Sequence, residues 1–255
     1  ARLLEKKLPV KLEIEVQARI TEPADGRNVI GDLPGGDKKD EMVLMGGHLD
    51  SWHGGTGATD NAAGVAVAIE AARILKTLGL NLRRTVRVAF WAGEEVGFVG
   101  SRAHVKEHLA DRETMARKPE HARLSAYYNY DNGCGKIRGI YLQGNDMLRP
   151  VFEAWLKPFH DLGAATVTIR NTFGTDHLAF DEVGVPGFQF IQDPLDYGAV
   201  THHSNMDVLE RCPAGDLMQS AAIMASFVYH TAVRDTLLPR KPLPMPRKAG
   251  EPRRP

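Results

Sequence analysis

Alternating apolar and polar residues over residues 11–20 form the first clear pattern in the chain. The apolar positions of this segment are Leu12, Ile14, Val16, Ala18 and Ile20. Because successive side chains of a strand point to opposite faces, the pattern predicts a half-buried strand, antiparallel or near a sheet edge. Residues 42–45, in contrast, are all apolar. They predict a central strand that is covered on both faces.

Strand-like and helix-like segments alternate through the rest of the chain. Residues 62–78 are rich in alanine, carry apolar residues at helical spacing, and are followed by Gly79, which can end a helix. The other predicted strands are 28–33, 85–91, 126–130, 137–142, 166–169 and 188–191, and the other predicted helices are 99–109, 147–162, 176–182 and 213–232. This alternation predicts an α/β three-layer sandwich: a mostly parallel mixed sheet with helices on both faces.

Composition sets the domain organisation. The chain has 255 residues, of which 43% are hydrophobic and 25% charged, as in an ordinary globular protein. We expect one domain over residues 1–236. Residues 237–255 are rich in proline and basic residues, and such a segment cannot bury a core. It is predicted to be an extended C-terminal tail, either disordered or lying on a surface.

The charge balance restricts the class of partner. Lys and Arg number 32, as do Asp and Glu, so net charge gives no argument for binding nucleic acid or an anionic membrane surface. No apolar run approaches the roughly 18 residues that span a bilayer, and the first residues lack the apolar stretch of a signal peptide. A small molecule or a peptide is the expected partner. The two cysteines, Cys134 and Cys212, can pair, stay free or simply pack.

Residues of the types that bind metals follow several of the predicted strands. They are His48, Asp50, Asp60, Glu94, Glu95, Asp131, His202 and His203. Open α/β sheets place their ligand crevices at the carboxyl ends of strands, so we expect these side chains to converge. Imidazole and carboxylate groups together suit zinc. Because neighbouring side chains on extended backbone diverge, one of the adjacent glutamates can bind metal while the other faces a water molecule.

Six motifs give the chain a specific resemblance. In order they are GGHLDS, GATDNAAG, AGEEVG, YNYDNG, GTDH and HHSNMD. From about Asn28 to Ala232 the chain resembles the co-catalytic two-zinc exopeptidases, a family that includes secreted leucine aminopeptidases and plasma glutamate carboxypeptidase, and it looks closest to the second branch. The resemblance implies a zinc exopeptidase catalytic domain over residues 1–236, two zinc ions per chain and a peptide substrate.

The same resemblance implies a role for each ligand. His48 and Asp131 would hold one zinc, Glu95 and His203 the other, and Asp60 would bridge both. His203 is preferred over His202 because the family's ligand histidine directly precedes Ser or Thr and lies four residues before an acidic residue. Ser204 and Asp207 meet these two conditions.

Further residues match the family pattern around these ligands. Glu94 is predicted to be the general base that activates a metal-bound water, and Asp50 the carboxylate that orients His48, although Asp50 also has a plain reading as a turn residue. A cis peptide bond between Asp60 and Asn61 is implied as well. Tyr197 is a candidate donor to the oxyanion, and Asp176 and His177 match a landmark close to the site.

Several alternatives stay open at this point. The residues do not distinguish removal of N-terminal residues from cleavage of dipeptides or removal of C-terminal residues, and by resemblance we favour dipeptides and short peptides with a free N-terminus. A glutaminyl-cyclase-like acyltransferase with a single zinc is disfavoured, because such a site has no need of both His48 and Asp131. A non-catalytic receptor-like relative is disfavoured because every ligand is present. The resemblance also implies a secreted or periplasmic protein, leaves a homodimer open, and suggests a short form or a fragment of a longer precursor.

Overall fold

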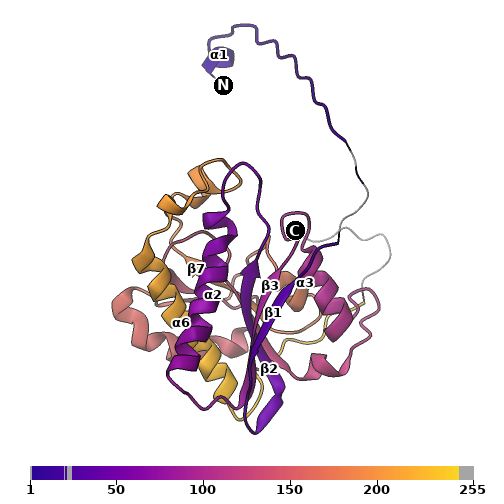
Figure 1. Ribbon diagram of the computed structural model, residues 1–255, viewed down its shortest axis with the longest axis vertical. Helices are drawn as coiled ribbons and strands as arrows, with labels where there is room; N and C mark the ends of the chain where they lie inside the picture. Colours follow the sequence, from indigo (N-terminus) through magenta and orange to yellow (C-terminus); the bar gives the residue numbers. More distant parts are fainter. Residues whose placement is uncertain (1, 20, 22–24, 247–255) are drawn as a thin grey trace.

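The computed structural model describes residues 2–19, 21 and 25–246, and its packed body is built around one mixed sheet (Figure 1). The sheet has the strand order β1-β3-β2-β4-β7-β5-β6. The strands are β1 (Val29–Leu33), β2 (Lys38–His48), β3 (Arg84–Trp91), β4 (Leu124–Asn129), β5 (Ile137–Tyr141), β6 (Thr166–Thr168) and β7 (Gly187–Gln192). β1 is antiparallel to β3 and β5 to β7, whereas the other neighbours are parallel. The mostly parallel sheet expected from the sequence is confirmed.

Helices cover both faces of the sheet, as the alternation of segments predicts. On one face, α2 (Ala63–Thr77) lies beside α6 (Ala214–Val233), and α4 (Arg149–Leu156) packs against the same core (Figure 1). On the other face lie α3 (Val99–His104) and α5 (His177–Asp181). The predicted helices 99–109 and 147–162 are each broken into shorter helical turns. The three-layer sandwich is therefore confirmed.

The strand predicted at 11–20 is wrong for its described part. Residues 11–19 form no strand, residue 20 lies outside the described residues, and Leu12, Ile14 and Val16 are each 78% exposed. Together with α1 (Arg2–Glu5), this segment lies away from the packed body (Figure 1). Alternation makes a segment suitable for a half-buried sheet position, but a strand also needs hydrogen bonds from a neighbour. Among the described residues, none supplies them.

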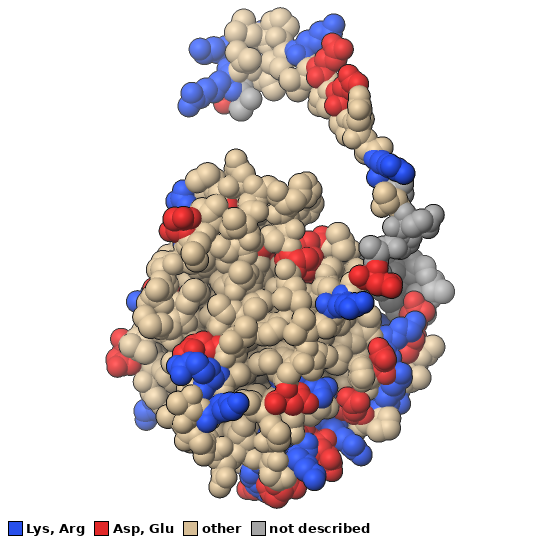
Figure 2. Space-filling view, in the orientation of Figure 1, with Lys and Arg blue, Asp and Glu red and all other residues tan. Residues whose placement is uncertain are grey.

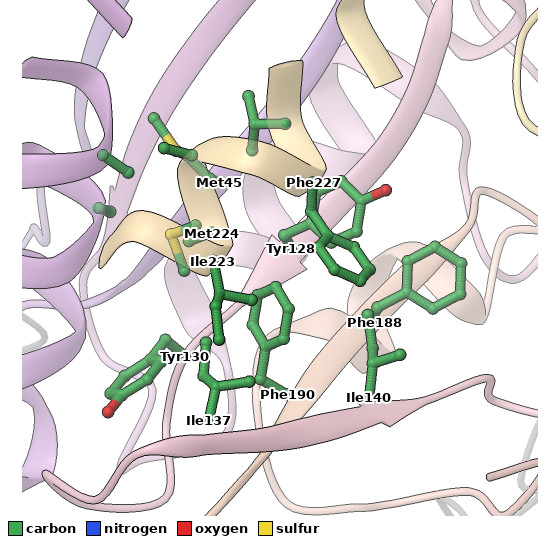
Figure 3. Close-up of a cluster of buried hydrophobic side chains, with 14 of the residues drawn as sticks. Met45, Tyr128, Tyr130, Ile137, Ile140, Phe188, Phe190, Ile223, Met224 and Phe227 are labelled. Atoms are coloured by element: carbon green, nitrogen blue, oxygen red, sulfur yellow. The ribbon is translucent and has the colours of Figure 1, made fainter. Parts of the chain in front are cut away.

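Several aromatic side chains pack together in the larger core, between the sheet and helices α2, α4 and α6. Tyr128 of β4, Phe190 of β7 and Phe227 of α6 meet with ring centroids 5.5 to 6.0 Å apart (Figure 3). All three are completely buried, and Phe152 and Trp155 of α4 also lie against Phe227. This packing fixes α6 on the sheet.

Phe227→Ala is expected to lower the free energy of unfolding by about 3 to 5 kcal/mol, because the change removes buried area and leaves a cavity in a closely packed core. Urea denaturation followed by tryptophan fluorescence would measure this loss. Met218→Ala is the matched control, since Met218 lies on the same helix and is 66% exposed. An equal loss in both variants would contradict the view that Phe227 anchors this helix.

The described part of the predicted tail, residues 237–246, contains no helix or strand and lies on the body. Leu238 is buried against the larger core, and Arg240 donates hydrogen bonds to the carbonyl oxygens of His121 and Leu124. Lys241 forms an ion pair of 2.7 Å with Asp181. This part of the tail therefore lies on a surface, while the division of the chain at residue 236 stays a prediction.

Three further observations concern surface charge, membrane-spanning helices and covalent links. Acidic and basic side chains are interspersed over the face shown in Figure 2. In the described part of the chain, no helix is long and apolar enough to cross a membrane. Cys134 and Cys212, left open by the sequence, form a disulfide that joins segments 78 residues apart.

Candidate active site

The predicted site residues gather at the carboxyl edge of four adjacent strands, β3, β2, β4 and β7. His48 is the last residue of β2, Glu94 and Glu95 follow β3, Asp131 follows β4, and His203 lies in the connection after β7. Because these strands are parallel, their carboxyl ends lie on the same edge of the sheet. The fold thus brings together residues up to 155 positions apart in sequence, from His48 to His203.

Asp60 enters the site from the turn Ala58–Ala62, which leads into α2. Its peptide bond to Asn61 is cis, which confirms the expectation from the resemblance. Glycines allow this turn to lie close to the strand ends. A Cβ on Gly64 would lie 2.2 Å from the carbonyl oxygen of Tyr130, and one on Gly47 would lie 2.6 Å from the Asn61 side chain. A side chain at Gly64 would therefore clash with the main chain next to Asp131, and one at Gly47 would displace the Asn61 side chain.

The two oxygens of Asp60 face two different groups of side chains. Asp60 Oδ1 lies 3.0 Å from His48 Nε2, which is itself 3.2 Å from Asp131 Oδ1. Asp60 Oδ2 lies 3.4 Å from His203 Nε2, which is itself 2.9 Å from Glu95 Oε2. One carboxylate is therefore shared between two imidazole–carboxylate pairs. This is the arrangement expected of a ligand that bridges two ions.

His203 and His202 occupy different positions relative to these groups. His202 Nε2 lies 3.8 Å from Asp60 Oδ2, and its ring packs against Tyr197 with centroids 4.8 Å apart. His203 is the closer of the two to Asp60 and contacts Glu95 directly. The geometry favours the predicted choice of His203, whose role as a ligand stays a prediction.

Glu94 lies beside the first group and is buried. Its Oε2 is 4.0 Å from His48 Nε2, while its Oε1 has no hydrogen-bond partner among the described residues. Burial, reinforced by the neighbouring Asp131 carboxylate, raises the pKa of Glu94 to about 10. Burial also raises the pKa of Glu95, with the Asp60 carboxylate as the next cause. The two pKa shifts have the same physical cause: several carboxylates lie close together and are shielded from water.

This crowding fits a site for divalent cations. A cavity lies over these side chains. The described residues that line it include four carboxylates, those of Asp60, Glu94, Glu95 and Asp131, and neither Lys nor Arg. Burial lowers the pKa of His48, but the carboxylates of Asp131, Asp50 and Asp60 outweigh burial and raise that pKa well above its ordinary value. A divalent cation held by these side chains would take the place of that proton and supply the compensating charge. Nitrogen and carboxylate oxygen are also the donors that zinc accepts.

Asp50 contacts His48 and the two glutamates at once. Its backbone carbonyl oxygen lies 2.9 Å from His48 Nδ1, and its carboxylate lies 3.6 Å from the same nitrogen. The carboxylate oxygens also accept hydrogen bonds from the backbone N–H groups of Glu94 and Glu95, at 3.0 and 3.1 Å. The role of Asp50 as the residue that orients His48 stays a prediction, and the structure adds its hold on the two glutamates.

Two residues that contact the proposed ligands, Trp52 and Asp207, were not assigned to the site from the sequence. Trp52 donates from Nε1 to Glu95 Oε2 at 2.8 Å, and its ring lies 5.2 Å from the His203 ring. Asp207 accepts hydrogen bonds from the backbone of Thr59 and Asp60. Trp52 directly follows the GGHLDS motif, and this position was the only signal for it in the sequence. In the sequence, Asp207 was noted only because it lies four residues after His203.

Of the remaining predicted residues, Tyr197 lines the cavity over this site, whereas Asp176 and His177 are buried outside its lining. Burial raises the pKa of the Tyr197 phenol, with the nearby Asp131 and Asp60 carboxylates as the next causes. Asp176 is fully buried, accepts a hydrogen bond of 2.5 Å from Ser101 Oγ, and has its pKa raised by burial to about 7. His177 is also fully buried and contacts the Thr172 carbonyl oxygen at 3.3 Å, rather than a ligand.

A cavity of about 470 Å³ opens over these groups. Its walls are formed by Gly97, Phe98 and Asn132 and by Phe173, Gly174 and Tyr197, with the acidic groups, His202 and His203 also lining it. A volume of this size suits a short peptide. The fold and the site together define a candidate two-metal centre at the carboxyl edge of an α/β sheet.

Comparison with known proteins agrees with this description. Residues 28–228 match the model of peptidase family M28, so the chain belongs to that family, and the resemblance inferred from its motifs is confirmed. Mouse carboxypeptidase Q is 28% identical over 240 residues, covering 94% of this chain and 49% of that protein. The chain thus spans about half the length of the relatives it matches.

Two solved structures extend the comparison. The peptidase M28 precursor of Shewanella amazonensis SB2B superposes with a TM-score of 0.73 at 34% identity, covering 86% of this chain and 47% of that one. A zinc aminopeptidase from Bacillus subtilis gives a TM-score of 0.65 at 25% identity, covering 82% and 50%. Both therefore share the fold of this chain.

Proposed function

We propose that this protein is a zinc-dependent exopeptidase that hydrolyses dipeptides or short peptides with a free N-terminus, using two zinc ions per chain. The observation that carries the proposal is the shared Asp60 carboxylate, with one oxygen facing His48 and Asp131 and the other facing His203 and Glu95. Membership of family M28 and similarity to a zinc aminopeptidase support the choice of metal.

Each residue has a role in the proposed reaction. His48 and Asp131 would hold one zinc, Glu95 and His203 would hold the other, and Asp60 would be shared between the two sites. When bound, zinc lowers the pKa of a coordinated water and polarises a carbonyl group. Glu94 accepts the proton of the attacking water and passes it to the leaving amine. The Tyr197 hydroxyl stabilises the oxyanion by donating a hydrogen bond.

The described lining of the cavity supports recognition of an amine through what it lacks. A free peptide N-terminus is a cation and needs no cationic partner, while the four carboxylates of this lining are already assigned, three as zinc ligands and Glu94 as the base. A C-terminal carboxylate requires a cationic partner such as Arg, and neither Arg nor Lys lies in that lining. A second candidate, removal of C-terminal residues, follows from the similarity to carboxypeptidase Q.

Blocked peptides distinguish the two candidates. Purified protein is assayed for zinc content and for hydrolysis of a dipeptide in unblocked, N-acetylated and C-amidated forms. We expect about two zinc ions per chain and a loss of hydrolysis on N-acetylation alone, because acetylation removes the cationic amine. Loss on C-amidation alone would establish a carboxypeptidase instead. One zinc or none, without hydrolysis, would favour the cyclase-like or the receptor-like alternative.

A further inference from the structure

The Asp207 carboxylate holds the turn that carries the bridging residue. Its Oδ1 accepts a hydrogen bond from the Thr59 backbone N–H at 2.6 Å, and its Oδ2 accepts one from the Asp60 backbone N–H at 3.2 Å. The side chain is only 3% exposed. Two consecutive backbone groups, one of them belonging to Asp60 itself, are thus held by a single buried side chain.

Other contacts join the same two segments of the chain. The Asp207 carbonyl oxygen accepts hydrogen bonds from the Thr56 N–H at 2.8 Å and from the Thr56 hydroxyl at 3.0 Å. Thr59 Oγ1 donates to Thr201 Oγ1 at 3.0 Å, and both side chains are buried. Residues 201–207 are therefore attached to residues 56–60 at both ends, and His203 lies between the attachments.

This attachment couples two of the proposed ligands. Asp60 Oδ2 and His203 Nε2 lie 3.4 Å apart, although the residues are 143 positions apart in sequence. Metal affinity depends on how closely the unliganded side chains already match the bound geometry, and groups that orient ligands influence that match. A carboxylate suits this task, since both of its oxygens accept hydrogen bonds and neither repels a backbone N–H.

We infer that Asp207 is a positioning residue, which fixes the Asp60 turn against the His203 segment and so presets the spacing of the two metal sites. The inference rests on the proposed function, because it assigns Asp60 and His203 to the same metal centre. It parallels Asp50, whose carboxylate holds the backbone of Glu94 and Glu95. Two aspartates thus each bind two consecutive backbone N–H groups. Asp207 binds those of Thr59 and Asp60, and Asp50 binds those of Glu94 and Glu95.

Asp207→Asn tests the inference with little change of volume. The amide places an NH₂ group against one of the two backbone N–H groups, so one hydrogen bond is lost and two donors face each other. We expect zinc affinity to fall about 10- to 100-fold, the range found for groups that orient metal ligands. Competition with a chromophoric zinc chelator measures both dissociation constants for the full chain, and thermal unfolding of the metal-free protein reports on the fold separately.

A control variant separates positioning from general effects. Glu210→Gln removes a carboxylate charge from an exposed position three residues further along. We expect it to retain the parent zinc constants. Asp207→Asn should also retain a single cooperative unfolding transition without metal.

The outcomes separate this inference from the proposed function. A parent protein that binds zinc, together with an Asp207→Asn variant that binds it equally well, would overturn the positioning role alone. A parent that binds no zinc would overturn the proposed function itself. Should Asp207→Asn fail to fold, Asp207→Glu keeps the charge but displaces its oxygens, and unchanged zinc constants in that variant would again overturn the inference.

Discussion

Glu94→Gln is expected to leave zinc binding intact while lowering kcat by about 10²- to 10⁴-fold, the contribution typical of a general base. Glutamine has nearly the same shape, so the buried position beside His48 is kept, but its amide cannot accept the proton of the attacking water. Zinc analysis of the purified variant, together with steady-state hydrolysis of an unblocked dipeptide, would measure both properties.

The matched control for this variant is Glu107→Gln. Glu107 belongs to the same connection between β3 and β4, and its side chain is 75% exposed. We expect this control to retain parent activity. Full activity in the Glu94 variant with its zinc still bound would contradict the assignment of Glu94 as the base, and loss of zinc would instead make Glu94 a ligand.

Asp60→Ala is expected to have the larger effect, because Asp60 is the one carboxylate that faces both groups of ligands. Without it, His48 and His203 no longer share a partner, and both sites lose a donor. We expect zinc content to fall below that of the parent at each site. Hydrolysis should fall further than after loss of the base, by at least about 10⁴-fold, since without metal neither the water nor the substrate carbonyl is activated. Metal analysis after dialysis, followed by the same dipeptide assay, would test this.

Asp40→Ala serves as the control for Asp60→Ala, because Asp40 is an exposed aspartate on β2. It should keep both zinc ions and full activity. Two tightly held zinc ions in the Asp60 variant would show that the two groups bind metal independently and would remove the bridging role. Loss of one ion alone would assign Asp60 to a single site.

Much of the fold could be predicted from local sequence pattern. The apolar run at 42–45 and the alanine-rich segment before Gly79 correspond to β2 and α2, because burial on both faces and helical spacing are properties of a few neighbouring residues. The segment 11–19 shows the limit of this reasoning. Its alternation has the period of a strand, but whether a partner strand lies beside it is not a local property.

For the site as well, some features could be predicted from the sequence and others could not. Motif order and the positions of acidic and imidazole groups after strands pointed to His48, Asp60, Glu94, Glu95, Asp131 and His203, all of which the fold brings to one sheet edge. Spacing favoured His203 over His202, in agreement with the distances to Glu95 and Asp60. The sequence pointed to the Asp50 carboxylate as a neighbour of the His48 imidazole, 3.6 Å away in the structure, but gave no sign that the same carboxylate binds the backbone of the two glutamates.

By itself, the sequence determined the class of fold, the family and the residue types available for the chemistry, since these follow from periodicity and from motifs of a few residues. Only the tertiary structure decided which oxygen of Asp60 faces which group, that Trp52 reaches Glu95, and that Asp207 holds the Asp60 turn. The physical reason is that a hydrogen bond depends on distances and directions between atoms within about 3 Å of each other. Thr59 and Asp207 are 148 residues apart in sequence, and their contact exists only once the sheet has brought both segments together.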